Sequence, residues 1–158
     1  MGKRVRIYLE RTDGVARTVM PISDSDSIKP SSELLLRQVH PNFMQAGRLW
    51  SRAFTPTDAD NGELSVDRDT IISAKDAFER YLANKKLSTA GGCWGVSVQE
   101  FSNLGLNTYS DPITDTENPT NTNLAHALVN FAAYPTDKHK ALGKAAHRKA
   151  ADRGQLYP

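Results

Sequence analysis

The chain has 158 residues, of which 39% are hydrophobic and 24% charged, and its formal net charge is +2. This length suits one domain with a buried core, and the composition is typical of a globular protein. The apolar runs are too short for a membrane span, we expect no signal peptide, and the small net charge does not by itself indicate nucleic-acid binding. Because Cys93 is the single cysteine, no internal disulfide can form, which favours a reducing compartment and a cytoplasmic protein.

The beginning of the chain predicts a β-hairpin. Apolar and polar residues alternate on both sides of an Asp-Gly turn signal at 13–14. A two-residue turn there pairs Ile7 with Met20 and Glu10 with Arg17, so that opposite charges face each other across the strands.

A polar segment that contains a proline follows this hairpin and predicts a linker. We therefore divide the chain into an N-terminal β-hairpin at 1–22, a linker at 23–33 and a single domain at 34–158.

The first half of that domain predicts three strands. Residues 33–41 hold the most apolar run and end at a proline, and residues 49–56 also have strand character. An Asn-Gly turn at 61–62 precedes a short strand at 64–66.

The next segments predict a helix and then a strand. Residues 70–85 carry an apolar stripe at helical spacing, with Thr70 as the expected N-cap. Residues 89–101 predict a glycine-led strand, in which Glu100 ends the apolar face that begins at Trp94.

The last third predicts an irregular loop, a strand and a helix. The polar residues 107–123 show no periodicity, residues 125–131 are strand-like, and residues 136–154 predict a helix with Thr136 as N-cap. This order indicates an α+β fold, in which two helices pack on a mostly antiparallel sheet that carries the N-terminal β-hairpin.

Arg37 and His40 are the polar side chains of the most apolar run. A buried guanidinium must be paired, so Arg37 predicts either a structural bridge to an Asp, a Glu or backbone carbonyls, or a site for a bound anion. Glu100 is the expected partner, with Ser51 as a possible third member of a polar cluster. His40 precedes a proline at the strand end, where it is either a capping residue or a catalytic one.

The order of Arg37, Ser51 and Glu100 is similar to that of ADP-ribosyltransferases, which use an Arg or His, a Ser and a Glu on separate strands. This resemblance implies that Arg37 holds a phosphate of NAD, that Ser51 supports the site and that Glu100 engages a ribose hydroxyl.

The four histidines offer a different chemistry. Two of them could act as acid and base in metal-independent RNA cleavage, with Arg37 or a lysine of the C-terminal helix on the phosphate. The sequence does not show which of them converge: His40, His126, His139 and His147.

Positive charge is concentrated near the C-terminus. Residues 138–153 contain six Lys and Arg, whereas residues 87–137 contain none. Such a run is usually the solvated face of a helix, but Lys138, Lys144 and Arg148 could form a patch for an anion or an acidic partner.

Other patterns in the sequence carry little chemistry. No metal-ligand spacing recurs and no cofactor motif is present, so we predict neither a metal nor a cofactor. No basic residue is close to Cys93 in the sequence, which favours a buried and inert thiol over a nucleophile.

The order of the segments LLLRQVHPNF, GRLWSRAFTPT, LSV, WGVSVQE, AHALVNF and RGQLYP resembles that of a group of short uncharacterised bacterial proteins. The resemblance covers residues 34–158 and implies a bacterial or phage origin, but it implies no activity.

Two hypotheses for function follow. The first is a small cytosolic accessory or regulatory protein that acts through protein-protein contacts, for which an exposed edge strand could recruit a partner strand. The alternative is a small enzyme, ADP-ribosyltransferase-like or a metal-independent RNase, with a site around Arg37, Ser51 and Glu100. We leave open whether the protein is an enzyme. Nucleic acid is a secondary candidate partner through the C-terminal helix, and no membrane partner is expected.

Overall fold

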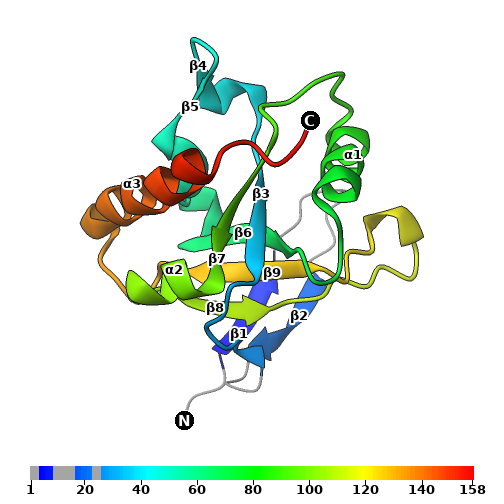
Figure 1. The fold of residues 1–158 in the computed structure, drawn as a ribbon. Helices are drawn as coiled ribbons and strands as arrows, with labels where there is room; N and C mark the ends of the chain where they lie inside the picture. The colour runs from blue at the N-terminus through cyan, green and yellow to red at the C-terminus, as the bar shows by residue number, and fades with distance from the viewer. Residues whose placement is uncertain (1–3, 9–16, 23–25) are drawn as a thin grey trace.

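The computed structural model describes residues 4–8, 17–22 and 26–158, and it confirms the α+β class (Figure 1). At its centre is a five-stranded sheet in the order β7-β3-β6-β9-β8, in which every neighbouring pair is antiparallel. Two further two-stranded sheets pair β1 with β2 and β4 with β5. The strands are β1 (Arg4–Tyr8), β2 (Arg17–Ile22), β3 (Leu34–Gln38), β4 (Met44–Gln45), β5 (Arg48–Leu49), β6 (Glu63–Arg68), β7 (Cys93–Ser97), β8 (Asn107–Ser110) and β9 (His126–Asn130).

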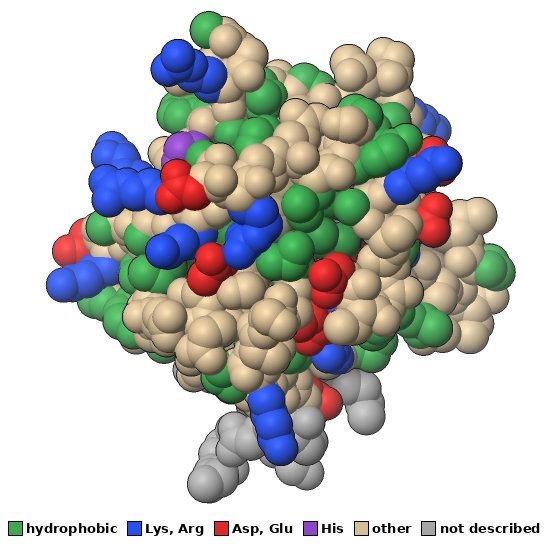
Figure 2. Space-filling model, in the orientation of Figure 1, with side chains coloured by type: hydrophobic (Ala, Val, Ile, Leu, Met, Phe, Trp, Pro, Cys, Tyr) green, Lys and Arg blue, Asp and Glu red, His purple; other side chains and the backbone are tan. Residues whose placement is uncertain are grey.

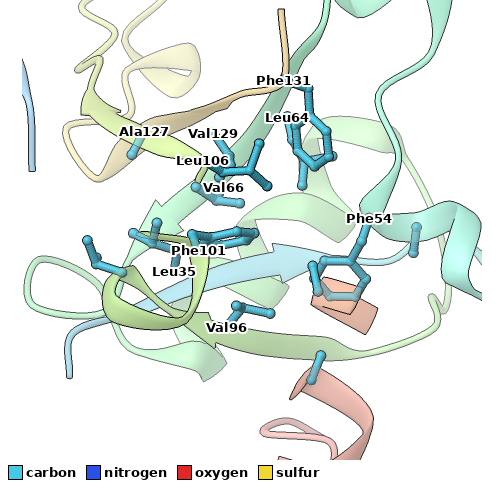
Figure 3. Close-up of a cluster of buried hydrophobic side chains, with 14 of the residues drawn as sticks. Leu35, Phe54, Leu64, Val66, Val96, Phe101, Leu106, Ala127, Val129 and Phe131 are labelled. Carbon is cyan, nitrogen blue, oxygen red and sulfur yellow. The ribbon is translucent and has the colours of Figure 1, made fainter. Parts of the chain in front are cut away.

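Helices cover both faces of the sheet (Figure 1). Leu35 and Leu36 are adjacent in β3, so their side chains point to opposite faces. Leu35 belongs to the larger core cluster, which includes Phe54, Phe101 and the buried alanines of α3 (Figure 3). Leu36 packs against Phe78 of α1 in a smaller cluster. The helices are α1 (Ala74–Lys85), α2 (Val98–Asn103) and α3 (Thr136–Arg153).

The strands of the N-terminal hairpin are confirmed, but the predicted register is wrong. Ile7 lies opposite Thr18 rather than Met20, which is a shift of two residues. Such a shift leaves every side chain on the same face, so hydrophobic alternation alone does not distinguish the two registers. Glu10 and the turn signal at 13–14 lie outside the described residues.

The described part of the segment predicted as a linker, residues 26–33, packs on the domain. Ile28 is buried in the larger core cluster, and its N–H donates to the Thr108 carbonyl on β8 at 2.9 Å. Glu33 binds Arg68 of β6 through two hydrogen bonds. A single apolar residue in a polar stretch is thus enough to anchor this segment.

Outer strands of the five-stranded sheet have backbone partners outside it. On β7, Cys93 donates its N–H to the Tyr157 carbonyl at 2.7 Å and accepts from the Leu156 N–H at 2.8 Å. On β8, Tyr109 forms a bridge with Ser27. The C-terminal residues and the segment at 26–33 therefore each cover part of one edge.

Residues 49–56 do not form the predicted strand. Ser51–Phe54 is a short 3-10 helix, and its neighbouring residues Ala53 and Phe54 are both fully buried. Burial of two adjacent side chains against one core is incompatible with the alternation of a strand.

The helix predicted at 70–85 begins four residues later than expected. Ser73 is the N-cap of α1, and its hydroxyl accepts from the Asp76 N–H at 3.1 Å. The Thr70 hydroxyl instead donates to the Glu33 carboxylate, so a tertiary contact takes the residue that the sequence offered as a cap.

The C-terminal third follows the prediction more closely. β9 is the expected strand, and α3 begins at Thr136 with Pro135 at the N-cap position. The segment at 107–123 is not wholly irregular, because its first residues form β8. No helix among residues 4–8, 17–22 and 26–158 is long and apolar enough to cross a membrane.

Candidate functional site

A cleft of about 770 Å³ lies between α1 and the sheet. β3 pairs with β6 only at Leu35 and Leu36, so the two strands are no longer paired from Arg37 onward. This volume is within the range of pockets that bind small molecules. Its polar lining includes Arg37, His40, Asp67, Arg80, Tyr81 and His126.

Arg37 is a half-buried cation in this cleft. Its Nε donates to the Ala53 carbonyl at 2.8 Å, and its Nη1 donates to the Ser65 carbonyl at 3.0 Å. Within the part of the chain that the structure describes, no carboxylate forms an ion pair with its guanidinium. The guanidinium therefore joins strands that have separated, and its positive charge is not neutralised by a bonded acid.

Burial is the largest influence on the pKa of Arg37, and it lowers that pKa from the ordinary value. The charges of Asp60 and Asp67 oppose the shift. Burial also raises the pKa of the Tyr81 phenol, and the Arg37 charge opposes this second shift. Arg37 and Tyr81 thus share one partly desolvated region of the cleft.

The two acids near Arg37 are bonded to other groups. Asp67 is 8% exposed, and its Oδ1 lies 3.2 Å from Nη2 of Arg80 and accepts from the Asn123 amide at 2.8 Å. The Asp60 carboxylate accepts from the backbone N–H and the hydroxyl of Thr57. Both carboxylates thus act on Arg37 through their charge and form no hydrogen bond or ion pair with it among the described residues.

His126 forms a pair with Asp111 at the start of β9. Its Nδ1 lies 3.0 Å from the Asp111 carbonyl oxygen and 3.1 Å from Oδ2 of the same residue. Each of these two side chains is 12% exposed. The ring is therefore held in one orientation at the wall of the cleft.

His40 has a capping role and also lines the cleft. Its Nδ1 accepts from the Asn42 N–H at 3.1 Å, at the start of the short 3-10 helix Pro41–Phe43. Of the two alternatives for His40, the local geometry shows the capping one. The ring nevertheless lies at the cleft.

Glu100 does not pair with Arg37. The predicted strand ends at Ser97, where a capping box starts α2: the Ser97 hydroxyl accepts from the Glu100 N–H, and the Glu100 carboxylate accepts from the Ser97 N–H. Arg153 donates to the same carboxylate at 2.9 Å. Burial alone raises the pKa of Glu100, but the hydrogen bonds from Arg153 and Ser97 outweigh it and lower the pKa.

Ser51 begins the 3-10 helix whose Ala53 carbonyl accepts from Arg37, but Ser51 itself does not line this cleft. The structure thus brings Arg37 and His40 to one cleft and leaves Ser51 and Glu100 outside it. The convergence of Arg37, Ser51 and Glu100 that an ADP-ribosyltransferase-like site requires is not present.

Two of the four histidines lie outside the cleft. Nε2 of His139 is 3.0 Å from the Tyr134 carbonyl oxygen, and Nε2 of His147 is 2.7 Å from the Leu49 carbonyl oxygen. Both rings link α3 to neighbouring segments, and only His40 and His126 remain as candidates in the cleft.

The basic candidates of the C-terminal helix are exposed. Figure 2 shows Lys and Arg side chains on the side of the molecule where α3 lies. Lys138, Lys144 and Arg148 are on the solvent side of this helix, away from the cleft. This arrangement fits a solvated helix face, and their role in binding stays a prediction.

Cys93 is fully buried in β7, which confirms the expected buried thiol. Burial is the main cause that raises its pKa to about 11. The nearest polar group is the Gln38 side-chain amide, which donates to the sulfur at 3.3 Å. A protonated thiol in this position is a poor nucleophile.

Sequence reasoning identified Arg37, His40 and His126 but missed three residues of the site: Asp67 and Arg80, which line the cleft, and Asp111, which is bonded to His126. Nothing in the local sequence marks them, because they lie on different elements that meet only in the fold. The capping box was visible, since Ser97 and Glu100 have the spacing of a helix start. No protein-family model, curated protein or solved structure matches this chain.

Proposed function

We propose that the cleft binds a small ligand that carries a phosphate group, with Arg37 as the anchoring cation. The observation that supports this proposal is the guanidinium of Arg37, which is bonded to two backbone carbonyls and to no carboxylate of the described residues. Carbonyl oxygens satisfy its N–H groups without neutralising its charge. A bound phosphate would stabilise this partly desolvated cation, which no bonded acid neutralises.

The charge balance of the cleft supports an anionic ligand. Among the described residues, the lining contains three cationic side chains and two carboxylates, which leaves one positive charge in excess when both histidines are neutral. Asp67 is paired with Arg80, so Arg37 and Lys85 face the single remaining carboxylate, that of Asp60. Arginine forms geometrically specific, charge-assisted hydrogen bonds with phosphate.

The reach of the guanidinium also fits this proposal. Nε and Nη1 of Arg37 are bonded to protein carbonyls, whereas its Nη2 has no hydrogen-bond partner among the described residues. A phosphate oxygen at Nη2 would complete the hydrogen bonding of a group that the backbone holds in place. Preorganisation of this kind reduces the entropy that binding costs.

The hypothesis of an accessory protein that acts through protein contacts stays a prediction. Strand addition needs an unpaired edge, and in the described five-stranded sheet both outer strands make backbone contacts with other segments. The cleft therefore supports ligand binding more directly than the sheet supports partner binding.

The test is a calorimetric titration with inorganic phosphate, uridine monophosphate and uridine at low ionic strength. We expect the monophosphate to bind and uridine to bind much more weakly. Arg37→Met should weaken the binding of the monophosphate by about 10- to 100-fold, because a hydrogen bond to a charged group contributes about 1.5–3 kcal/mol.

Two further variants make the test specific. Lys85→Met changes an exposed cation of the cleft that has no structural hydrogen bond to a described residue, and it should weaken binding by several-fold without unfolding. Arg148→Met removes the same charge from α3 and should leave binding unchanged. Equal losses in Lys85→Met and Arg148→Met, or no binding of either phosphate ligand, would refute the proposal.

A further inference from the structure

The hydrogen bonds of His126 determine which of its ring nitrogens carries the proton. Both groups next to Nδ1 are oxygen acceptors of Asp111, its backbone carbonyl and its carboxylate. Nδ1 must therefore carry the hydrogen and donate it. In the neutral ring, Nε2 is then left with a lone pair, which is the form required of a general base.

Nε2 of His126 is available to a ligand. The residue lines the cleft, and within the described chain Nε2 has no hydrogen-bond partner. Asp111 has the role of a positioning residue, since its carboxylate orients the ring and stabilises the imidazolium that forms when Nε2 accepts a proton.

Charged groups approach His126 from the neighbouring strand β6, from α1 and from the segment after β8. Asp67 lies directly opposite His126 in the β6–β9 ladder, and Arg80 of α1 is bonded to Asp67. Asp111 follows β8. Arg37 is bonded to the carbonyl of Ser65, which lies two residues from Asp67 along β6. The other ionisable groups that line the cleft, among the residues that the structure describes, are His40, Asp60, Tyr81 and Lys85.

We propose that His126 is the general base of a ribonuclease reaction in this cleft, an inference that rests on the phosphate binding proposed above. RNA is the substrate class that fits, because it carries a hydroxyl nucleophile next to the phosphate that Arg37 would hold. With a base and a cation in the same cleft, the reaction needs no nucleophile from the protein.

The step is an internal transesterification. Nε2 of His126 takes the proton of the 2′-hydroxyl, and the 2′-oxygen forms a bond to phosphorus. The bond between phosphorus and the 5′-oxygen breaks, and the leaving oxygen takes a proton from water in the open cleft. The products are a 2′,3′-cyclic phosphate and a 5′-hydroxyl, and the imidazolium returns its proton to the solvent.

His40 does not act as the general acid in this scheme. Its Nδ1 accepts the Asn42 N–H, so that nitrogen cannot carry a proton while the cap is formed. The neutral ring holds its hydrogen on Nε2, and loss of that proton would leave an imidazolate. His40 instead offers an N–H donor to a phosphate oxygen at the edge of the cleft.

The experiment measures cleavage of a short uridine-rich RNA in EDTA, with the 2′,3′-cyclic phosphate end as the product. The same oligonucleotide with 2′-deoxyuridine throughout measures binding without reaction. His126→Asn should reduce the cleavage rate by about 10²- to 10⁴-fold, the usual contribution of a positioned base, and should leave the affinity for the deoxy oligonucleotide within a few-fold of wild type. His147→Asn, which changes a histidine outside the cleft, should retain wild-type cleavage.

A second variant tests the role of Asp111 and guards against loss of folding. Asp111→Asn should lower the cleavage rate of the folded protein, because the ring loses the carboxylate that orients it, and should leave the affinity for the deoxy oligonucleotide within a few-fold of wild type. A purely structural role of Asp111 would instead lower the amount of folded protein, with the affinity and the rate falling together.

The outcomes separate this inference from the proposed function. If the wild-type protein binds uridine monophosphate and the deoxy oligonucleotide but does not cleave RNA, the inference is refuted and the phosphate site stands. If neither phosphate ligand binds and RNA is intact, both are refuted. Cleavage that His126→Asn retains would also overturn the assignment of the base.

Discussion

Glu33 offers the sharpest test of how the segment before β3 contributes to stability. The sequence predicts a linker up to this residue, whereas the structure places its carboxylate 2.8 and 3.1 Å from Nε and Nη2 of Arg68. The Glu33 side chain is 8% exposed and that of Arg68 is 24% exposed. The Thr70 hydroxyl also donates to this carboxylate.

We expect Glu33→Gln to destabilise the protein by about 2 kcal/mol at neutral pH. This value lies between the 0–1 kcal/mol of an exposed pair and the 3–5 kcal/mol typical of breaking a buried one, because Arg68 keeps partial contact with water. For a chain of this length it corresponds to a decrease in Tm of roughly 4–8 °C. Urea unfolding followed by circular dichroism measures the free energy, and thermal unfolding measures Tm.

The pH dependence gives an independent check. Burial by itself raises the pKa of Glu33, but the hydrogen bonds from Arg68 and Thr70 and the Arg68 charge outweigh it, so the pKa lies below 4.5. The stabilisation is therefore complete above the ordinary pKa of the unfolded chain and is lost as pH falls through the lower folded-state pKa. The difference between wild type and Glu33→Gln should shrink over the same acidic range.

Glu79→Gln is the matched control, because Glu79 is an exposed residue of α1 without an ion pair to a described residue. We expect its unfolding free energy to stay within about 0.5 kcal/mol of wild type. If Glu33→Gln were equally neutral, or if its effect persisted unchanged into acid, the clamp would not stabilise the domain and residues 26–33 would behave as the predicted linker.

Three further predictions concern the scaffold. Ser97→Ala should destabilise the protein by about 1 kcal/mol in urea unfolding, because α2 loses its cap, and an unchanged free energy would contradict the capping box. Gly143→Ala should cost about 1–3 kcal/mol, since a Cβ there would collide with the Thr55 hydroxyl and approach the Phe54 carbonyl at 3.1 Å; a Tm equal to wild type would show that this contact relaxes freely. Cys93, with a pKa of about 11, should not react with a thiol reagent at pH 8 until the protein is unfolded, and rapid labelling of the native protein would contradict its burial.

Local patterns in the sequence determined much of the secondary structure. The Asn-Gly pair at 61–62 adopts positive φ at both residues before β6, as a tight turn requires. The apolar stripe of α1 and the long polar-faced helix α3 lie where the periodicity placed them. These features depend on neighbours within a few residues, which the sequence shows directly.

Local patterns failed where two competing local signals met or where a distant residue intervened. The alternation of Val96 and Val98 predicts a strand that continues to Glu100. The capping box of Ser97 and Glu100 ends this strand and starts α2. Thr70 is a good N-cap by type, yet its hydroxyl is bonded to Glu33, 37 residues away. The residues next to Thr70 in the sequence therefore do not show that its hydroxyl binds Glu33 instead of capping α1.

For the candidate site, too, the sequence predicted some features and the tertiary structure decided the others. The sequence alone predicted that Arg37, a cation in an apolar strand, needs polar partners, and the structure supplies two backbone carbonyls. The sequence did not determine which partner, since the expected Glu100 is bonded to Arg153. The separation of β3 from β6, the pairing of Asp67 with Arg80 and the position of His126 opposite Asp67 decided where the cleft lies. Only the tertiary structure brings residues from three strands and a helix to one cleft, because side chains so far apart in the chain become neighbours only when the sheet has formed.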